Sequence, residues 1–217
     1  MSSSTSEAGA AVYNKNVLSI YDPFVLGFSS TFAWRSPSRH TVAFYNRHVT
    51  ARHLDVGVGT GYFLDNCNFP DPKPAIALLD MNANSLQATA ARLQRYTPTT
   101  YTADVLQPIT LAEEPFTSIG LSFLFHCLPG AFPGKAAAVF TNLKPHLAPG
   151  GTLFGTTILG SGVKANPLAR LLMGIYNNKG IFSNTADTLP NLKAALQANF
   201  SSYTLEQRGM VAFFSGQ

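Results

Sequence analysis

Short apolar runs alternate along this 217-residue chain with longer stretches in which apolar residues recur at helical spacing. The short runs have the length and composition of buried strands, and they lie at 53–56, 75–80, 101–105, 116–124 and 152–158. The longer stretches predict helices, and they lie at 62–67, 86–96, 134–147 and 189–200. Strands that alternate with helices favour a parallel sheet with helices packed on its faces. The pattern therefore predicts an α/β fold.

The last part of the chain departs from this alternation. Residues 203–208 and 210–215 predict two antiparallel strands joined by a turn at Gly209. Such a hairpin would close the parallel sheet with an antiparallel edge. The sequence Pro149-Gly150-Gly151 predicts a tight reversal between a helix and the next strand, because this turn requires positive φ. Residues 160–187 show no regular period, and we expect an irregular segment there.

Residues 11–50 hold more apolar and aromatic side chains than a solvated arm would, and those at 13, 17, 20 and 24 share one helical stripe. A helix is expected to start at Asp22-Pro23, with a hinge at 27–30, and Ser36 is expected to cap a second helix at 37–49. We predict that 11–50 form a helical lid over the carboxyl end of the sheet, with plain core packing as the alternative. Residues 1–10 are small and polar, which predicts a flexible tail.

The strand that leads to Asp55 ends in a loop with glycines at alternate positions, Gly57, Gly59 and Gly61. Glycine allows positive φ and lets a ligand approach the backbone closely. Such a crevice at the carboxyl end of a strand is where open α/β sheets bind ligands. A dinucleotide fingerprint would place its third glycine at Tyr62, so this loop departs from that pattern. A turn that merely connects a strand to a helix remains the alternative for the loop taken alone.

The order Asp-x-Gly-x-Gly-x-Gly resembles the first motif of the class I S-adenosylmethionine (SAM) dependent methyltransferases. Asp80, Asp104, the His-Cys-Leu-Pro segment at 126–129 and the Leu-Ala-Pro-Gly-Gly segment at 147–151 extend the resemblance over 51–217. The chain looks like a small subgroup found in bacteria and fungi. The resemblance implies a Rossmann-like sheet in a single domain, 1–217, with a SAM-binding core at 51–217. It also implies methyl transfer from SAM. The aromatic residues near the N-terminus and at 160–185 favour a small, hydrophobic or aromatic metabolite as the acceptor, as in secondary metabolism.

Single residues acquire expected roles in such a site. A carboxylate at Asp55 can hold the ammonium group of the methionine moiety, directly or through water. Asp80 lies 19 positions after Gly61, where an acidic residue is placed to accept the ribose hydroxyls of an adenosine. The resemblance implies that Asp104 receives the adenine amino group. We expect the cofactor to contact Asp55, Gly57, Gly59, Gly61, Asp80, Met81, Asp104, Val105 and Ser122.

Methyl transfer needs an acceptor in near-attack geometry, and a general base only where the acceptor must lose a proton. His126 is the candidate catalytic base, because the ordinary pKa of histidine suits proton removal near neutrality. The alternative is that His126 only contacts the cofactor or packs beside it. Cys127 has no visible activating charge, so we do not expect a nucleophilic thiol. Aromatic side chains predicted to bind the substrate are Tyr13, Tyr21, Trp34 and Tyr176.

The composition of the chain limits which classes of partner we expect it to bind. It is 46% hydrophobic and 12% charged with a net charge of +4, which suits a compact protein. Basic residues gather between 35 and 53, yet nucleic acid is not the expected partner, because no lysine run or known RNA module accompanies them. No apolar run reaches the roughly 18 residues of a membrane span, and Cys67 and Cys127 are too few for a disulfide framework. We expect a cytoplasmic monomer or homodimer without a bound metal.

One alternative function comes from a different class. The chain holds no unambiguous base or acceptor-specific residue, so it could bind SAM without transferring methyl. It would then act in a rearrangement or cyclisation, or in a binding role.

Overall fold

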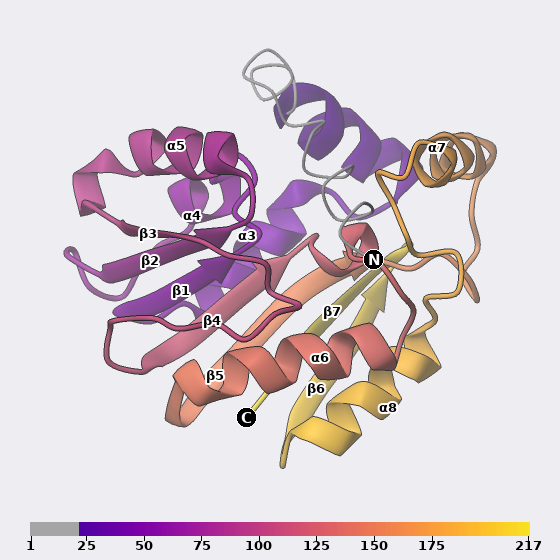
Figure 1. Ribbon diagram of the computed structural model, residues 1–217. Coiled ribbons are helices and arrows are strands. Elements are labelled where there is room, and N and C mark those ends of the chain that lie inside the picture. Colours follow the sequence, from indigo (N-terminus) through magenta and orange to yellow (C-terminus); the bar gives the residue numbers. More distant parts are fainter. Residues whose placement is uncertain (1–21) are drawn as a thin grey trace.

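The computed structural model describes residues 22–217, and for residues 22–26 it describes the backbone alone. Seven strands form one sheet in the order β3-β2-β1-β4-β5-β7-β6 (Figure 1). The strands are β1 (Arg52–Val56), β2 (Ala75–Asp80), β3 (Thr99–Thr102), β4 (Phe116–Ser122), β5 (Leu147–Ile158), β6 (Tyr203–Arg208) and β7 (Val211–Gly216). The first five are parallel, and β7 pairs antiparallel with both β5 and β6. The predicted α/β fold with an antiparallel C-terminal hairpin is confirmed.

Helices cover both faces of this sheet. They are η1 (Asp22–Ala33), α3 (Ser38–His48), α4 (Tyr62–Asn66), α5 (Ala83–Arg92), α6 (Gly134–Leu143), α7 (Pro167–Asn178) and α8 (Leu189–Asn199). Alternate residues of β2 enter different cores, because successive side chains of a strand point to opposite faces. Ile76 and Leu78 join the core beneath α3, α4 and α5, whereas Ala77 and Leu79 join the core beneath α6 and α8.

The direction of the chain through the sheet reverses between β1 and β4. From β1 it steps outward to β2 and β3, and then it returns to β4 on the other side of β1 and continues to β5. A crevice opens at the carboxyl ends of strands where the strand order reverses in this way. The N-terminal helix η1 lies beside α7 above this end of the sheet (Figure 1).

Several element boundaries differ from the prediction. The segment 160–187 contains α7, which we expected to be irregular, and Asn166 caps α7 by accepting a hydrogen bond from the Ala169 N–H. β5 begins at Leu147, so Pro149-Gly150-Gly151 lies within the strand rather than at a reversal. Gly150 does have the expected positive φ of 75°. The register between β4 and β5 shifts over this stretch, which accommodates the irregular backbone.

Three short 3₁₀ turns account for most other differences. They are η2 (Gln94–Tyr96), η3 (Phe125–Cys127) and η4 (Lys144–His146). The helices predicted at 86–96 and 134–147 therefore end in tighter turns, a common way for an α-helix to terminate. The predicted strand 101–105 lies at Thr99–Thr102, and the strand expected to reach residue 124 stops at Ser122.

The N-terminal segment also differs in detail. The π-helix η1 runs without a break through 27–30, so these residues are not a hinge between two helical pieces. Ser29 and Ser30 within it are buried. Pro37 occupies the N-cap position of α3 without a side-chain cap bond, so the cap predicted at Ser36 is wrong. Residues 11–21, with the apolar stripe that begins at Tyr13, lie outside the described residues.

Candidate active site

Two adjoining cavities lie at the carboxyl ends of β1, β2 and β4. The smaller cavity has a volume of about 100 Å³ and the larger cavity about 240 Å³. Gly57, Gly59 and Phe123 line both of them. The glycine loop after β1 and the first residue after β4 therefore form the boundary between the two cavities.

The backbone of the glycine loop explains why these positions are glycine. Gly57 and Gly61 have φ values of 71° and 72°, and a Cβ on either one would collide with a neighbouring side chain, Leu124 or Thr89 respectively. Gly59 also has a positive φ, of 55°, but its missing Cβ would point into open space. The backbone of Gly59 is thus open to a ligand in either cavity.

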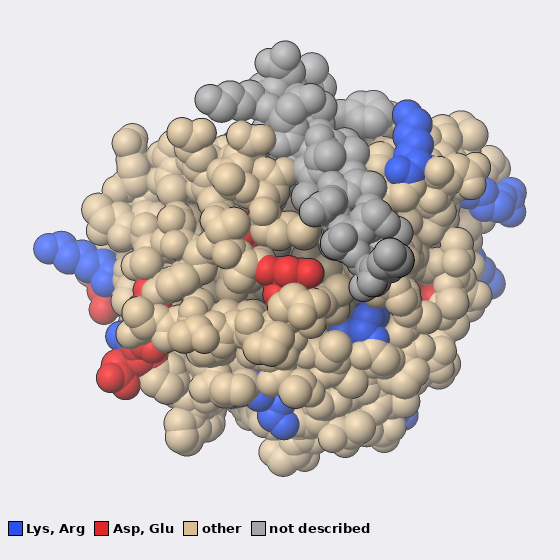
Figure 2. All heavy atoms as spheres, viewed as in Figure 1, with Lys and Arg blue, Asp and Glu red and all other residues tan. Residues whose placement is uncertain are grey.

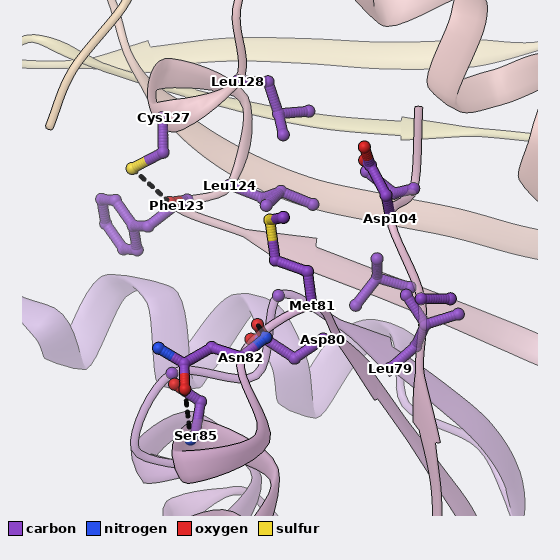
Figure 3. Close-up of a pocket in the computed structure, with 15 residues that line it drawn as sticks. Leu79, Asp80, Met81, Asn82, Ser85, Asp104, Phe123, Leu124, Cys127 and Leu128 are labelled. Atoms are coloured by element: carbon purple, nitrogen blue, oxygen red, sulfur yellow. Dashed lines mark hydrogen bonds between the residues drawn. The ribbon is translucent and has the colours of Figure 1, made fainter. Parts of the chain in front are cut away.

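The smaller cavity combines carboxylates with an apolar lining (Figure 3). Asp80 and Asn82 come from the end of β2, and Asp104 comes from the loop after β3. Apolar side chains also line this cavity, namely Leu79, Met81, Val105, Leu124 and Leu128. Carboxylates around an apolar centre match a nucleoside, which has a flat ring and a polar sugar.

Hydrogen bonds fix both carboxylates of the smaller cavity. Asp80 Oδ1 accepts from the Asn82 N–H at 2.9 Å, and Asp104 Oδ1 accepts from the Leu106 N–H at 2.9 Å. Burial raises the pKa of Asp80 and the nearby Asp55 adds to the rise, while backbone N–H groups of the loop oppose it. A ligand that donates hydrogen bonds to Asp80 would favour its charged form.

The larger cavity contains Asp55, which is 5% exposed. Asp55 Oδ1 accepts a hydrogen bond from the Tyr45 hydroxyl at 2.9 Å and lies 3.5 Å from His53 Nε2. Burial, followed by the charge of Asp55, raises the pKa of Tyr45 well above its ordinary value. Tyr45 therefore remains a hydrogen-bond donor, which directs one oxygen of Asp55 from the side of α3.

His126 lies in the wall of the larger cavity, on the turn η3. Its ring meets the Phe182 ring edge-on with centroids 4.4 Å apart, and it is 4% exposed. Burial lowers the pKa of His126 to about 3, and the charge of Lys135 contributes to the shift. The imidazole is thus neutral at pH 7 and a weak base. These surroundings favour the packing or contact role over the role of general base.

Cys127 lines the smaller cavity, next to His126 in the chain. Burial raises the pKa of its thiol to about 12, with Lys135 opposing this shift. A protonated thiol is a poor nucleophile, which agrees with the expectation from the sequence.

Residues predicted from the sequence converge on the two cavities. Those that line the smaller cavity are Gly57, Gly59, Asp80, Met81, Asp104 and Val105. Those that line the larger cavity are Asp55, Gly57, Gly59, Gly61, Ser122, His126, Trp34 and Tyr176. Tyr13 and Tyr21 lie outside the described residues.

Two contributions could not be predicted from sequence spacing. Tyr45 lies in the helix predicted at 37–49, and no sequence pattern indicated that its hydroxyl reaches Asp55. Phe123 has a φ of 58°, an unfavourable conformation for a bulky residue, and its N–H donates to Thr156 O at 2.7 Å. Strained residues often occur at ligand sites. Phe123 lines both cavities and stacks on Phe63, which lines the larger one, with ring centroids 5.7 Å apart.

The charges of the molecule are dispersed. On the face in Figure 2, Lys and Arg lie scattered among uncharged atoms rather than in one patch. The basic cluster noted at 35–53 is not a single surface either, because His53 is fully buried and His48 packs against Phe154. Within residues 22–217, no group of three or more His, Cys, Asp or Glu side chains could hold a metal ion. Of the helices in that range, none has the length and apolarity needed to cross a membrane.

Similarity to known proteins gives the family. A methyltransferase-domain family matches residues 54–153. Demethylluteothin O-methyltransferase of Streptomyces thioluteus is 39% identical over 206 residues, which cover 95% of this chain and 89% of that protein. The physcion biosynthesis cluster O-methyltransferase of Aspergillus chevalieri is 37% identical over 210 residues, which cover 96% and 94%.

The same fold recurs among solved structures. The DhpI–SAH complex has a TM-score of 0.67 at 13% identity and covers 100% of this chain and 98% of that one. The family assignment rests on the two sequence relatives, which match this chain almost end to end. The chain belongs to the class I S-adenosylmethionine-dependent methyltransferases.

Proposed function

We propose that this protein transfers the methyl group of SAM to a hydroxyl oxygen of a small, flat, hydrophobic metabolite. The observation that carries the proposal is the pair of adjoining cavities, which share the glycine loop but differ in chemistry. One suits a nucleoside and the other suits an aromatic acceptor. The two relatives described above are both named O-methyltransferases, which supports oxygen as the acceptor atom.

The smaller cavity would hold the adenosine. Asp80 would accept the ribose hydroxyls, because its carboxylate lies at the cavity edge and keeps acceptor capacity beyond its bond from Asn82. Asp104 would face the adenine amino group, while Met81 and Val105 would contact the ring. A hydrogen bond to a charged group contributes about 1.5–3 kcal/mol, so Asp80 would supply much of the specificity for a ribose.

The methionine part would pass Gly57 and Gly59 into the larger cavity, where Asp55 offers a carboxylate to its ammonium group. Tyr45 directs one oxygen of this carboxylate, leaving the other available. Bound SAM supplies an electrophilic methyl group on a positively charged sulfur. Asp55 and Ser122 would orient the cofactor so that this group faces the acceptor wall.

The acceptor would lie against an aromatic wall formed by Trp34, Tyr176, Phe182 and His126. His126 would accept a hydrogen bond from the acceptor hydroxyl through its neutral imidazole. With a pKa of about 3, it would orient the hydroxyl rather than hold its proton, and the proton would leave to solvent water as S-adenosylhomocysteine and the methyl ether form. Proximity and orientation, which can lower a barrier by about 7–11 kcal/mol, would then supply most of the rate.

The N-terminal segment supplies one side of this site. Ser30 and Trp34 in and after η1, and Tyr45 in α3, line the larger cavity. We propose that residues 11–50 act as a lid that closes over bound ligands and excludes water. Closure predicts slower amide exchange at 22–35 when S-adenosylhomocysteine (SAH) and an acceptor are both present. Unchanged exchange would leave these aromatic residues with a packing role alone.

Mass spectrometry tests the proposed reaction. Incubation with SAM and a panel of neutral phenols, naphthols and matched anilines is expected to add the mass of one CH2 to the hydroxyl compounds. SAH in place of SAM serves as the control, because it lacks the methyl group. A product of unchanged mass would support rearrangement, and retention of SAM without any product would support a binding role. Either result, or methylation of the anilines alone, would contradict the proposal.

A further inference from the structure

We infer that the buried ion pair between Lys135 and Asp187 positions the acceptor wall, and so governs how the acceptor fits without governing how the cofactor binds. Lys135 Nζ lies 2.6 Å from Asp187 Oδ2, and the two side chains are 1% and 0% exposed. This inference rests on the proposed function, because it assigns the larger cavity to the acceptor. Neither residue lines a cavity, so both would be positioning residues.

The pair is surrounded by backbone groups that it holds in place. Lys135 Nζ donates to Ser183 O at 2.7 Å and to Leu128 O at 3.3 Å. Asp187 Oδ1 accepts from the Phe132 N–H at 3.2 Å. A buried charge is costly unless a partner and hydrogen bonds compensate it. Here the compensating bonds join the segment 128–135 to the segment 183–187.

Further hydrogen bonds carry this connection to the residues of the wall. Ser183 follows Phe182 in the chain, and its N–H donates to His126 O at 2.7 Å while its carbonyl accepts from Lys135 Nζ. Asn184 Nδ2 donates to Ile158 O at 2.9 Å. The main-chain carbonyl of Asp187 accepts from the N–H groups of Gly160 and Ser161 at 3.1 and 3.2 Å. The ion pair thus ties together η3, the end of β5 and the loop 181–187.

Each of these segments contributes to the larger cavity. His126 comes from η3, Ile158 from the end of β5, and Ile181 and Phe182 from the loop. Phe182 is central, because its ring contacts those of His126, Tyr176 and Trp34, with centroids 4.4, 4.9 and 6.1 Å away. A shift of the loop would therefore displace the wall as a unit.

The cofactor side is built differently. Most residues of the smaller cavity come from 56–85 and 103–105, on the far side of β1 from this ion pair. Of the two carbonyl groups to which Lys135 Nζ donates, only that of Leu128 belongs to a residue that lines the smaller cavity. Loss of the pair should accordingly affect the acceptor much more than the cofactor.

The test separates positioning from a general contribution to stability. Asp187→Asn keeps the shape of the side chain but removes its charge, and the double variant Lys135→Met/Asp187→Leu replaces the pair with apolar groups. Apolar replacement of a buried ion pair often preserves stability. It also removes the donor to Ser183 O and Leu128 O. If the pair only stabilises the fold, the folded double variant should therefore keep its affinity for the acceptor. If the pair positions the acceptor wall, this affinity should fall.

The measurements are the affinity for SAH by calorimetry, the affinity for β-naphthol with SAH saturating, and acrylamide quenching of Trp34. Trp34 is the only tryptophan of the chain and lies beside Phe182, so its emission reports on the wall without any ligand. In both variants we expect β-naphthol to bind at least about tenfold more weakly, the scale of effect that pocket fit can produce. SAH affinity should change less than about threefold, within the usual context dependence of such effects, and quenching of Trp34 should increase. Glu206→Gln, which breaks an exposed pair with Arg208, is the control and should change none of these readouts.

Three results would overturn the inference. These are normal β-naphthol affinity and quenching in a folded double variant, equal losses of β-naphthol and SAH affinity, or failure of both variants to fold. If the wild-type protein binds SAH but not β-naphthol, the proposed acceptor class fails, and if it binds neither, the proposed function fails. In both cases Trp34 quenching still decides the positioning role, because unchanged quenching contradicts it and increased quenching supports it.

Discussion

The imidazole of His126 shows how burial separates the position of a residue from its reactivity. The sequence placed a histidine near the reacting groups, and the ordinary pKa of histidine made it a candidate base. In the structure the ring is enclosed by Phe182 and Phe123, at centroid distances of 4.4 and 6.1 Å. Its pKa falls to about 3 because burial disfavours the charged form. A neutral hydrogen-bonding group is the role that such surroundings allow.

The depressed pKa of His126 predicts acid sensitivity. The unfolded chain binds a proton on this histidine below about pH 6.5, whereas the folded chain does so only near pH 3, so stability is lost as the pH falls through this window. The loss should reach at most about 1.4 kcal/mol per pH unit. Urea unfolding between about pH 7 and pH 4 should show a shallower pH dependence for His126→Gln than for the wild type.

His40 and His48 also have lowered pKa values, but the wild type and His126→Gln both retain these two histidines. The difference between the two proteins in the pH dependence of unfolding free energy therefore reports on His126 alone. Parallel slopes for the two proteins would show that His126 is charged in the folded state, contrary to this account.

At the residue scale, local spacing placed Asp80 and the glycines at one crevice, whereas the surroundings of Asp55 and His126 could not be predicted. Asp80 and the glycines belong to a local motif, so their spacing alone places them together. The hydrogen bond from Tyr45 to Asp55 requires α3 to fold back over β1. The environment of His126 depends on Phe182, which lies far along the chain on another loop. No local pattern could reveal either contact.

At the scale of elements, the C-terminal hairpin contacts the backbone at Trp34, a residue of the acceptor wall. The Met210 N–H donates to Trp34 O at 2.9 Å, directly after the turn between β6 and β7. Gly209 forms this turn with a φ of 58°, and a Cβ there would overlap the carbonyl oxygens of Trp34 and Arg35. A glycine that looked like a simple turn residue is therefore required by a contact between the two ends of the chain.

Replacement of Gly209 by alanine should destabilise the protein through two effects. The left-handed conformation costs a side chain about 1–2 kcal/mol, and the overlap with Trp34 O adds a packing penalty of about 1–3 kcal/mol. Gly150→Ala is the matched control, because Gly150 has a φ of 75° but open space at its Cβ position. Urea unfolding should show a larger loss for Gly209→Ala, accompanied by a shift in Trp34 emission. Equal losses without such a shift would mean that the hairpin does not support the wall.

The elements that sequence analysis identified are those with a strong local signal. Strand β2 matches its predicted range 75–80, and the closing hairpin lies where expected. Helix α7 was missed because Gly174 and the polar run after Tyr176 obscured its period. Its start did carry a signal, since Asn166-Pro167 combines an N-cap residue with proline in the first turn. The early start of β5 depends on pairing between Leu147 and Phe116, a tertiary contact that composition does not encode.

At the scale of the whole molecule, the two proposed ligand sites are built from different parts of the chain. The half of the sheet that contains β1, β2 and β3 supplies most of the lining of the smaller cavity through local strand–loop–helix units. The N-terminal helices, α7 and the loop 181–187 supply most of the acceptor wall, and they are distant in sequence. This division explains why the family could be predicted from the sequence while the shape of the larger cavity could not.

Calorimetric titration with SAH tests the central claim, that the crevice beside β1 and β2 binds a SAM-type cofactor. We expect a Kd in about the micromolar range for the wild type. Asp80→Asn should weaken binding at least about tenfold, because it removes the charged acceptor for the ribose hydroxyls. Asp71→Asn, in the loop before β2 and outside both cavities, should bind as the wild type does. Binding of NADH without binding of SAM or SAH would contradict the account.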